Sequence, residues 1–441
     1  MAMDPAPRGR MLPSAAVTQH GRFACRMRVY VYHEHSPSLQ MQRNSGRHFG
    51  FSSMQAGPSH NVSCLEAACL YDTFNLNNVR QYTSEVPVYH RLVTTCPLTR
   101  DPEEADVFLV PFYFGYMMSL GWQIRKEGIP QAWKTEHREM IKAALSMYHS
   151  LPHLTAQTAS RHVFLFSCDS QFVNIALHKH LRKAIVVHLG DDMFHGDSFY
   201  RNYVQEHDLH HMPNGITLPY RVSQWMHLGF NRTGLHARPR PLLLSMNVNM
   251  ERHKVRREIA KDIRNSVSTL NATRKYRGLS SRLLLSSTMM GPAEAAQVAL
   301  QSTFCICPTG DSKGFTARFY FVLLHGCLPI RIDGYRRNAT LAPVAWPFPH
   351  LIDWNKVAID LPVRDASTLL PRLLAMSERE IEERQSYLRH VAHWLLFDND
   401  EHAHHDAAAA VVHKIERRVL GLGARNGTSL RNGTRLQRQL S

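Results

Sequence analysis

The chain has 441 residues, enough for two domains, and its 44% hydrophobic and 20% charged residues exclude a wholly disordered protein. The net charge of +16 indicates anionic partners, and acidic polysaccharide, anionic lipid and phosphorylated substrates all fit it. We expect no nucleic-acid partner, because the basic residues are spread along the chain without a helix-turn-helix, zinc-finger or RNA-binding signature.

The chain begins without a visible signal or membrane anchor. Residues 1–27 contain no apolar run and are rich in Arg and Pro, which predicts a disordered tail. The longest apolar stretch, Val107 to Trp122, is interrupted by Pro111 and is shorter than the ~20 residues that a spanning helix needs. We therefore expect either a soluble protein or one whose N-terminal anchor is absent from this chain.

Short apolar runs, rich in β-branched and aromatic residues, alternate with helical or loop segments along the chain. Unbroken apolar runs of this kind are typical of parallel strands buried on both faces, and their alternation with helices predicts an α/β fold. The predicted strands are Arg28–Tyr32, Val107–Phe114, His162–Phe166, Ala184–Leu189, Pro241–Met246, Ser302–Cys307, Cys327–Ile332 and Val357–Leu361.

A polar segment at residues 231–241 contains a glycine and two prolines, as a linker does, and it divides the chain into two α/β units. Near the end, Ser377 and Glu380 have the spacing of a capping box that begins a helix, and a second helix is predicted over 405–420. The predicted organisation is a tail (1–27), a first unit (28–230), the linker (231–241), a second unit (242–370), C-terminal helices (371–420) and a disordered tail (421–441).

Eight cysteines in a chain of this length do not make a disulfide scaffold, and no set of them has zinc-finger spacing. Cys64 and Cys69 are close enough in sequence to form a local bridge. Cys305 and Cys307 alternate on a predicted strand and so point to one face. We interpret these two, and Cys327, as buried structural residues.

One segment, Phe304 to Ile332, predicts a strand, a loop, a helix, a turn and a second strand. The loop, Pro308 to Gly314, consists of turn-forming residues. The helix begins at Thr316 or Ala317, and Gly326 ends it in the position where a left-handed backbone is usual. This arrangement places a glycine-bearing loop and a helix N-terminus at the carboxyl end of a strand, where open α/β sheets bind ligands.

Backbone N–H groups and the helix dipole at such a position favour a phosphate or a diphosphate. Arg318 lies in the first helical turn, where a cation gains nothing from the dipole, and its presence is explained if it contacts an anion held there. The alternative is that Arg318 pairs with a nearby carboxylate such as Asp311. The loop has neither P-loop nor G-x-G-x-x-G spacing. The residues that we predict to bind the anion are Pro308, Gly310, Asp311, Ser312, Lys313 and Arg318.

The same segment carries a resemblance to a known family. The run F-C-x-C-P-x-G, then an arginine, then G-C-x-P-[IV] after seven residues, resembles the signature of the exostosin-like glycosyltransferases. These positions are Phe304, Cys305, Cys307, Pro308, Gly310, Arg318, Gly326, Cys327, Pro329 and Ile330. The stretch EADVFLVPFYF, which begins at Glu104, resembles another family segment, and the resemblance extends in order over roughly residues 28–360.

The resemblance implies a GT-B fold, in which two Rossmann-like domains face each other across a cleft. The C-terminal domain would bind a nucleotide-sugar, usually a UDP-sugar, and the acceptor, a glycan or glycoprotein, would enter through the N-terminal domain. Transfer would invert the anomeric centre without a bound metal or a cofactor. Members are typically Golgi type II membrane proteins, and six N-glycosylation sequons in this chain favour the secretory lumen.

One position departs from the family's pattern. Many relatives carry a glutamate three residues after the arginine, where it can bind the ribose of the nucleotide, and this chain has Phe321 there. Either another group holds the ribose, or donor binding is weak, or the chain is a non-catalytic subunit with the exostosin fold. A basic glycan-binding protein is a further alternative.

An inverting transfer needs positive charge for the departing diphosphate and a base for the acceptor hydroxyl. Arg252, Arg256 and Arg257 are candidates for a second cation, although the three can equally form one solvated helix face. The base is expected at a strand end of the first unit. Asp191 and Asp192, which follow the strand Ala184–Leu189, are the preferred candidates.

Overall fold

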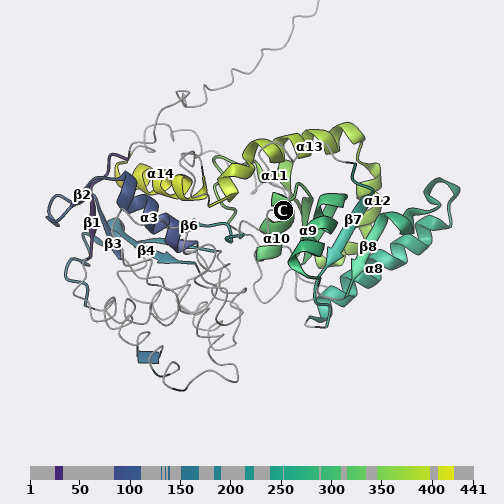
Figure 1. Cartoon of the computed structure of the whole chain (residues 1–441), viewed down its shortest axis with the longest axis horizontal. Coiled ribbons are helices and arrows are strands. Elements are labelled where there is room, and N and C mark those ends of the chain that lie inside the picture. Colours follow the sequence, from purple (N-terminus) through teal and green to yellow (C-terminus); the bar gives the residue numbers. More distant parts are fainter. Residues whose placement is uncertain are drawn as a thin grey trace, which may run out of the picture.

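The chain forms two β-sheets made of parallel strands, each with helices packed on it (Figure 1). No helix in the part that the structure describes is both long and apolar enough to cross a membrane. The computed structural model describes residues 25–32, 84–110, 150–167, 183–189, 214–222, 239–251, 253–287, 290–308, 315–333, 345–397 and 406–421, together with Gln131, Thr135, Arg138 and Glu139.

The first sheet has the strand order β2-β1-β3-β4-β5-β6. Its strands are β1 (Val29–Val31), β2 (Leu98–Thr99), β3 (Val107–Val110), β4 (His162–Phe166), β5 (Ile185–His188) and β6 (Gly215–Thr217). The residues of β3, β4 and β5 are all buried and mostly β-branched or aromatic, as expected for central parallel strands. Helix α3 (Glu85–Thr95) packs on this sheet, and η3 (Ala159–Arg161) precedes β4.

The second sheet has the strand order β11-β10-β9-β7-β8, and in Figure 1 the strands β7 and β8 lie between the helices α9 and α8. Its strands are β7 (Leu242–Asn247), β8 (Leu283–Ser286), β9 (Ser302–Pro308), β10 (Leu328–Asp333) and β11 (Ile359–Pro362). The helices of this part are α8 (Lys254–Asn271), α9 (Pro292–Gln301), α10 (Ala317–Leu324), α11 (Trp354–Val357), α12 (Leu369–Ala375) and α13 (Glu378–Val391). Short 3-10 turns are η7 (Arg274–Tyr276), η8 (Leu279–Arg282), η9 (Val363–Thr368) and η10 (Ala392–Leu395).

Both sheets share one connectivity. In each, the second strand lies on one side of the first strand and the later strands lie on the other side. The direction in which strands are added therefore reverses between β1 and β3, and again between β7 and β9. In open parallel sheets such a switch point, at the carboxyl ends of the flanking strands, is where ligands bind. The α/β class and the two-sheet architecture predicted from the sequence are confirmed.

Each predicted apolar run contains a strand, but the sequence did not reveal β2, β6 or β8. These three strands lack the feature on which the prediction depended, which is a long and fully buried apolar run. Strand β2 has only two residues, neither of them buried, and β6 includes a glycine. Strand β8 lies at an edge of its sheet and is half-buried along its length.

The predicted ends of two helices agree with the structure. The hydroxyl of Ser377 accepts a hydrogen bond from the backbone N–H of Glu380 (3.2 Å), as a capping residue does at the start of α13. Gly326 follows the end of α10 with a φ of 73°, a left-handed conformation that a glycine adopts without a steric penalty.

The last helix, α14 (Ala407–Val419), returns to the first sheet and lies beside α3 (Figure 1). Two ion pairs fix it there, between Arg91 of α3 and Asp406 (3.2 Å) and between Arg26 and Glu416 (3.6 Å). Arg418 also donates to the backbone carbonyl of Gly215 (3.0 Å). The amino-acid pattern of this helix predicted its length but not its place in the molecule.

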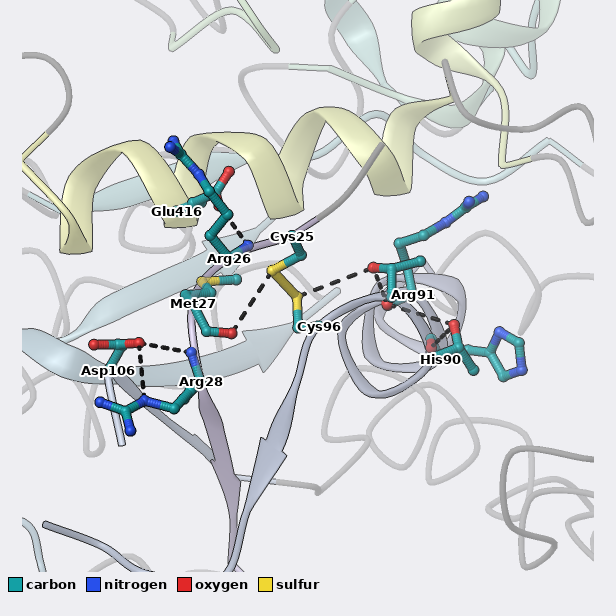
Figure 2. Close-up of a disulfide and its surroundings, with 11 residues drawn as sticks. Cys25, Arg26, Met27, Arg28, His90, Arg91, Cys96, Asp106 and Glu416 are labelled. Carbon is teal, nitrogen blue, oxygen red and sulfur yellow. Dashed lines mark hydrogen bonds and ion pairs between the residues drawn. A yellow bond between two sulfur atoms is a disulfide. The ribbon is translucent and has the colours of Figure 1, made fainter. Parts of the chain in front are cut away.

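Two disulfides cross-link the described residues, and the sequence did not predict either of them. Cys25 and Cys96 join the segment before β1 to the end of α3 (Figure 2). Cys25 and Met27 are buried there, although the sequence had placed them in the N-terminal tail. Cys305 and Cys327 form the second disulfide, while Cys307 is a buried free thiol. The predicted burial of these three cysteines is confirmed, and the suggested bridge between Cys64 and Cys69 lies outside the described residues.

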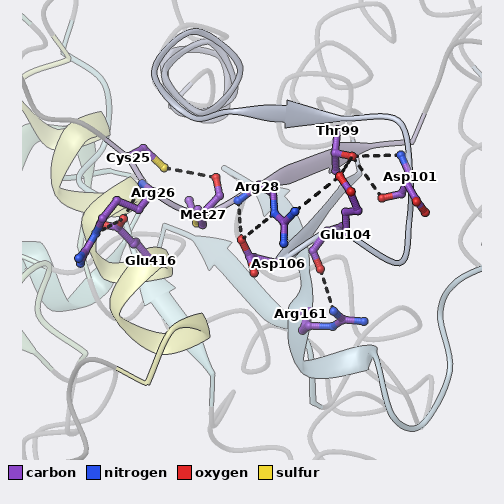
Figure 3. A network of polar contacts seen from close by, with 11 residues as sticks. Cys25, Arg26, Met27, Arg28, Thr99, Asp101, Glu104, Asp106, Arg161 and Glu416 are labelled. Carbon is purple, nitrogen blue, oxygen red and sulfur yellow. Dashed lines mark hydrogen bonds and ion pairs between the residues drawn. The ribbon is translucent and has the colours of Figure 1, made fainter.

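A polar network fixes the entry to the first sheet (Figure 3). The backbone N–H of Arg28 donates to the carboxylate of Asp106 (2.7 Å), and the guanidinium of Arg28 lies 3.5 Å from Glu104. Arg161 donates to the carbonyl of Ala105 (2.7 Å). These contacts hold the turn before β3 against the start of β1, so that the apolar run from Val107 enters the sheet in register.

Candidate functional site

A row of polar side chains crosses the second sheet near the carboxyl ends of its strands. Arg331 of β10 is paired in register with Cys307 of β9 on one side and with Asp360 of β11 on the other. Ser245 is opposite Cys305, so two residues further along Asn247 lies beside Cys307. The row therefore passes through the switch point between β7 and β9, where this type of sheet binds ligands.

Helix α10 begins near the carboxyl end of β9. Among the described residues, no side chain caps its first turn, and Thr316 before it is in an extended conformation. Arg318, in that first turn, is partly buried, and its Nε lies 3.5 Å from the carbonyl oxygen of Ile306 in β9. A helix N-terminus and a guanidinium thus meet at the carboxyl end of β9, an arrangement that favours an anion.

Arg256, on α8, contributes a second positive charge to this place. Its guanidinium donates to the backbone carbonyl of Asn249 (3.0 Å), in the segment between β7 and α8. Burial lowers the pKa of Arg318, and the nearby positive charge of Arg256 lowers it further. Two guanidinium groups that are partly removed from water repel each other, so an anion bound beside them would stabilise both positive charges.

The neighbouring residue, Arg257, points elsewhere. Its side chain is exposed and forms an ion pair with Glu251 (3.4 Å), whereas Arg256 is partly buried. Consecutive helical residues diverge by about 100° around the axis, so one of the two faces solvent. The structure therefore brings Arg256 and Arg318 together and leaves Arg257 outside the site.

The outer part of the polar row is closed by a buried ion pair. Arg331 donates twice to Asp360, from Nε (2.9 Å) and from Nη2 (2.8 Å), and its side chain is 1% exposed. The rings of Phe315 and Trp346 lie against its guanidinium, each with its centroid 6.0 Å away. The bidentate ion pair and the aromatic contacts hold the Arg331 side chain in place beneath Phe315, just before α10.

The position at which the family resemblance implies a glutamate carries an aromatic ring. Phe321 is buried on α10, and its ring lies 4.4 Å from the imidazole of His325, between ring centroids. The Nδ1–H of His325 donates to the carbonyl of Phe321 (2.7 Å), which holds the two rings together. Phe321 is thus packed into the helix surface and offers no polar group to a ligand.

The structure places only some of the predicted site residues. Pro308 is buried and ends β9, two residues after Ile306, whose carbonyl lies beside Arg318. The others lie outside the described residues: Gly310, Asp311, Ser312, Lys313, Arg252, Asp191 and Asp192. The alternative pairing of Arg318 with Asp311 lies outside them as well.

A second polar cluster, which the sequence did not predict, lies at the carboxyl edge of the first sheet. Glu85, the first residue of α3, is fully buried and accepts a hydrogen bond from the backbone N–H of Ser167, just after β4 (3.0 Å). Ser84 donates to the carbonyl of Pro219 (3.0 Å), and His188 ends β5 with 1% exposure. The only signal in the sequence was a serine–glutamate pair of the kind that begins helices, and such pairs are common.

Two parallel sheets of one connectivity, with paired guanidinium groups at a switch point, are consistent with the GT-B class of glycosyltransferases. The sequence model of the Exostosin GT47 domain matches residues 25–376, which is most of the chain, and the chain belongs to this family. The predicted family is therefore confirmed.

A relative from Caenorhabditis elegans, described as "Exostosin-1 homolog", is 33% identical to this chain over 100 residues. The match covers 22% of this chain and 23% of the relative, so the alignment spans about a quarter of that protein's length. Membership of the exostosin family points to glycosyltransferase chemistry, while the donor, the acceptor and the linkage depend on this chain's own site.

Proposed function

We propose that this chain transfers a sugar from a nucleotide-sugar, most simply a UDP-sugar, to a glycan or glycoprotein acceptor with inversion at the anomeric carbon. The observation that carries the proposal is the position of Arg318 at the start of α10, beside the carbonyl of Ile306 at the carboxyl end of β9, where the positive charge of Arg256 also acts on it. The unit around the second sheet is then the donor domain, and the unit around the first sheet receives the acceptor.

The chemistry is a single displacement. The acceptor hydroxyl oxygen attacks the anomeric carbon while the bond to the diphosphate oxygen breaks, and the hydroxyl proton passes to a base. Arg318 and Arg256 stabilise the negative charge that grows on the departing diphosphate. Asp191 and Asp192, which follow β5 in the sequence, remain our candidates for the base.

The cysteine pairs and the sequons support a place in the secretory pathway, with the Golgi lumen as the proposed compartment. Two disulfides cross-link the described part of the chain, and such bonds persist in oxidising compartments. Six sequons accompany them in the sequence.

The proposal is tested by UDP release from a panel of UDP-sugars with glycan acceptors. Arg318→Ala should lower the rate with the best donor by about 100-fold, as loss of one charge-stabilising donor does in other enzymes. Arg372→Ala is the matched control, because Arg372 is exposed on α12 of the same unit, and it should leave the rate unchanged. Equal rates in the wild type and in Arg318→Ala with every donor would refute the proposal.

A second candidate is a subunit that binds donor or glycan without turnover. Phe321 favours it, because the buried ring stands where many relatives have a ribose-binding carboxylate. The same panel separates the two functions. A protein that binds UDP in calorimetry, loses that binding in Arg318→Ala, and releases no UDP with any donor is the non-catalytic subunit.

A further inference from the structure

Asn247 is the last residue of β7 and lies at the switch point of the second sheet. Ser245, two residues earlier, contacts the sulfur of Cys305 (3.3 Å), so Ser245 and Asn247 project from the sheet face that carries the Cys305–Cys327 disulfide. Arg318, at the start of α10, interacts with Cys307, which the register of β7 and β9 places beside Asn247. Asn247 and Arg318 therefore belong to one side of the sheet.

The side chain of Asn247 is buried, with 6% of the residue exposed. Within the described part of the chain, nothing donates a hydrogen bond to its Oδ1. Its neighbours in the polar row differ in this respect, because Arg331 pairs with Asp360 and the thiol of Cys307 reaches the carbonyl of Cys305 (3.6 Å). A buried amide oxygen without a partner destabilises the fold, and at a ligand site such an atom is explained by a donor that the ligand supplies.

The chemistry of the unpartnered atom limits what that donor can be. A diphosphate at Arg318 and Arg256 presents only acceptor oxygens, so it cannot satisfy Asn247. The parts of a nucleotide-sugar that carry O–H donors next to the diphosphate are the ribose on one side and the transferred sugar on the other. Phe321 has no polar group with which to contact either of them.

We propose that Oδ1 of Asn247 accepts a hydrogen bond from a hydroxyl of the donor, on its ribose or on its transferred sugar. This inference rests on the proposed function, because it requires a nucleotide-sugar at Arg318. Asn247, at the end of β7, would then make the polar contact to the donor that Phe321 of α10 cannot make. Asn247 is then a residue that determines which donor is bound.

The test is calorimetric binding of UDP, 2′-deoxy-UDP, 3′-deoxy-UDP and UDP-sugars to the wild type and to Asn247→Leu. Loss of one neutral hydrogen bond should lower affinity by about 3- to 10-fold for ligands that carry the hydroxyl, and should not change it for the ligand that lacks it. A loss already present with UDP assigns the ribose, and a loss confined to UDP-sugars assigns the sugar.

Without a ligand, Asn247→Leu should not destabilise the protein. Leucine has nearly the same shape as asparagine and removes the unsatisfied oxygen, so the Tm of Asn247→Leu should equal or exceed that of the wild type. A residue with only a structural role would instead lose stability. Asn247→Ala serves as a second variant should the leucine not fit, and it should show the same discrimination between ligands.

Ser245→Ala is the matched control, because Ser245 is a buried polar residue on the same face of the same strand, one pleat further from the carboxyl end. It should bind every ligand as the wild type does. The inference is overturned if both Asn247 variants keep full affinity for all ligands, or lose affinity equally for deoxy and complete ones, while Arg318→Ala still abolishes UDP binding. If the wild type itself binds no nucleotide, the proposed function fails together with the inference.

Discussion

The disulfide between Cys305 and Cys327 tests how the proposed donor site is held together. It links two residues separated by 22 positions, and the enclosed segment contains Pro308 and Arg318. Replacing both cysteines with serine removes this constraint from the unfolded chain. For a loop of this length the chain-entropy model gives a loss of about 3 kcal/mol in the free energy of unfolding.

The other disulfide supplies the comparison. Cys25 and Cys96 are separated by 71 positions, for which the same model gives about 4 kcal/mol. Both double-serine variants should therefore unfold at lower urea concentration than the wild type, and the variant without Cys25 and Cys96 should lose more. UDP affinity should fall more in the variant without Cys305 and Cys327, because only the loop that this disulfide closes contains Arg318.

Urea denaturation followed by tryptophan fluorescence gives the stabilities, and calorimetry with UDP gives the affinities. An unchanged urea midpoint in Cys305→Ser/Cys327→Ser would show that the bond does not constrain the unfolded chain. An equal loss of UDP affinity in both double variants would refute the idea that the shorter loop organises the site, since one of them leaves that loop intact.

Two further predictions concern buried groups. Asp360→Ala should lower the free energy of unfolding, measured by urea denaturation, by about 3–5 kcal/mol, because it removes the bidentate partner of the buried Arg331. Adding Arg331→Met should restore much of this loss. A loss under about 1 kcal/mol in Asp360→Ala would contradict this account. Burial lowers the pKa of His162 to about 4, so between pH 6.5 and 4 the unfolded chain takes up a proton that the folded protein does not. Stability should fall over that window by up to about 3 kcal/mol, and a His162→Gln protein with the same slope would contradict it.

The sequence predicted the parts of the fold in which local pattern and tertiary environment agree. The central strands β4, β5 and β9 are long apolar runs because both of their faces are buried, and their bounds were close to those observed. The helix after β9 was recognisable because a helix start and a terminal glycine follow one another at a suitable spacing, and α10 and Gly326 agree with this. Edge strands such as β8 share neither property and were missed.

What the sequence could not supply depends on contacts between distant residues. Nothing in the spacing of Cys25 and Cys96 identifies them as partners across 71 positions. Arg256 and Arg257 cannot be told apart in the sequence. Only their different directions around α8 show which of them acts on Arg318. Asn247 is a single asparagine at the end of a strand. Its interest comes from its burial and from its unpartnered oxygen, which appear only once the sheet is assembled.

The return of α14 to α3 has a practical consequence for anyone who shortens this chain. The match to the family ends at residue 376, which would be a natural place for truncation. Such a protein would lack the helix whose residues Ala407–Val412 are almost fully buried, as is Ile415. The apolar side of α3 would then be exposed to water, and the second-sheet part would lose α13 and η10, so a fragment with the family's boundaries should aggregate.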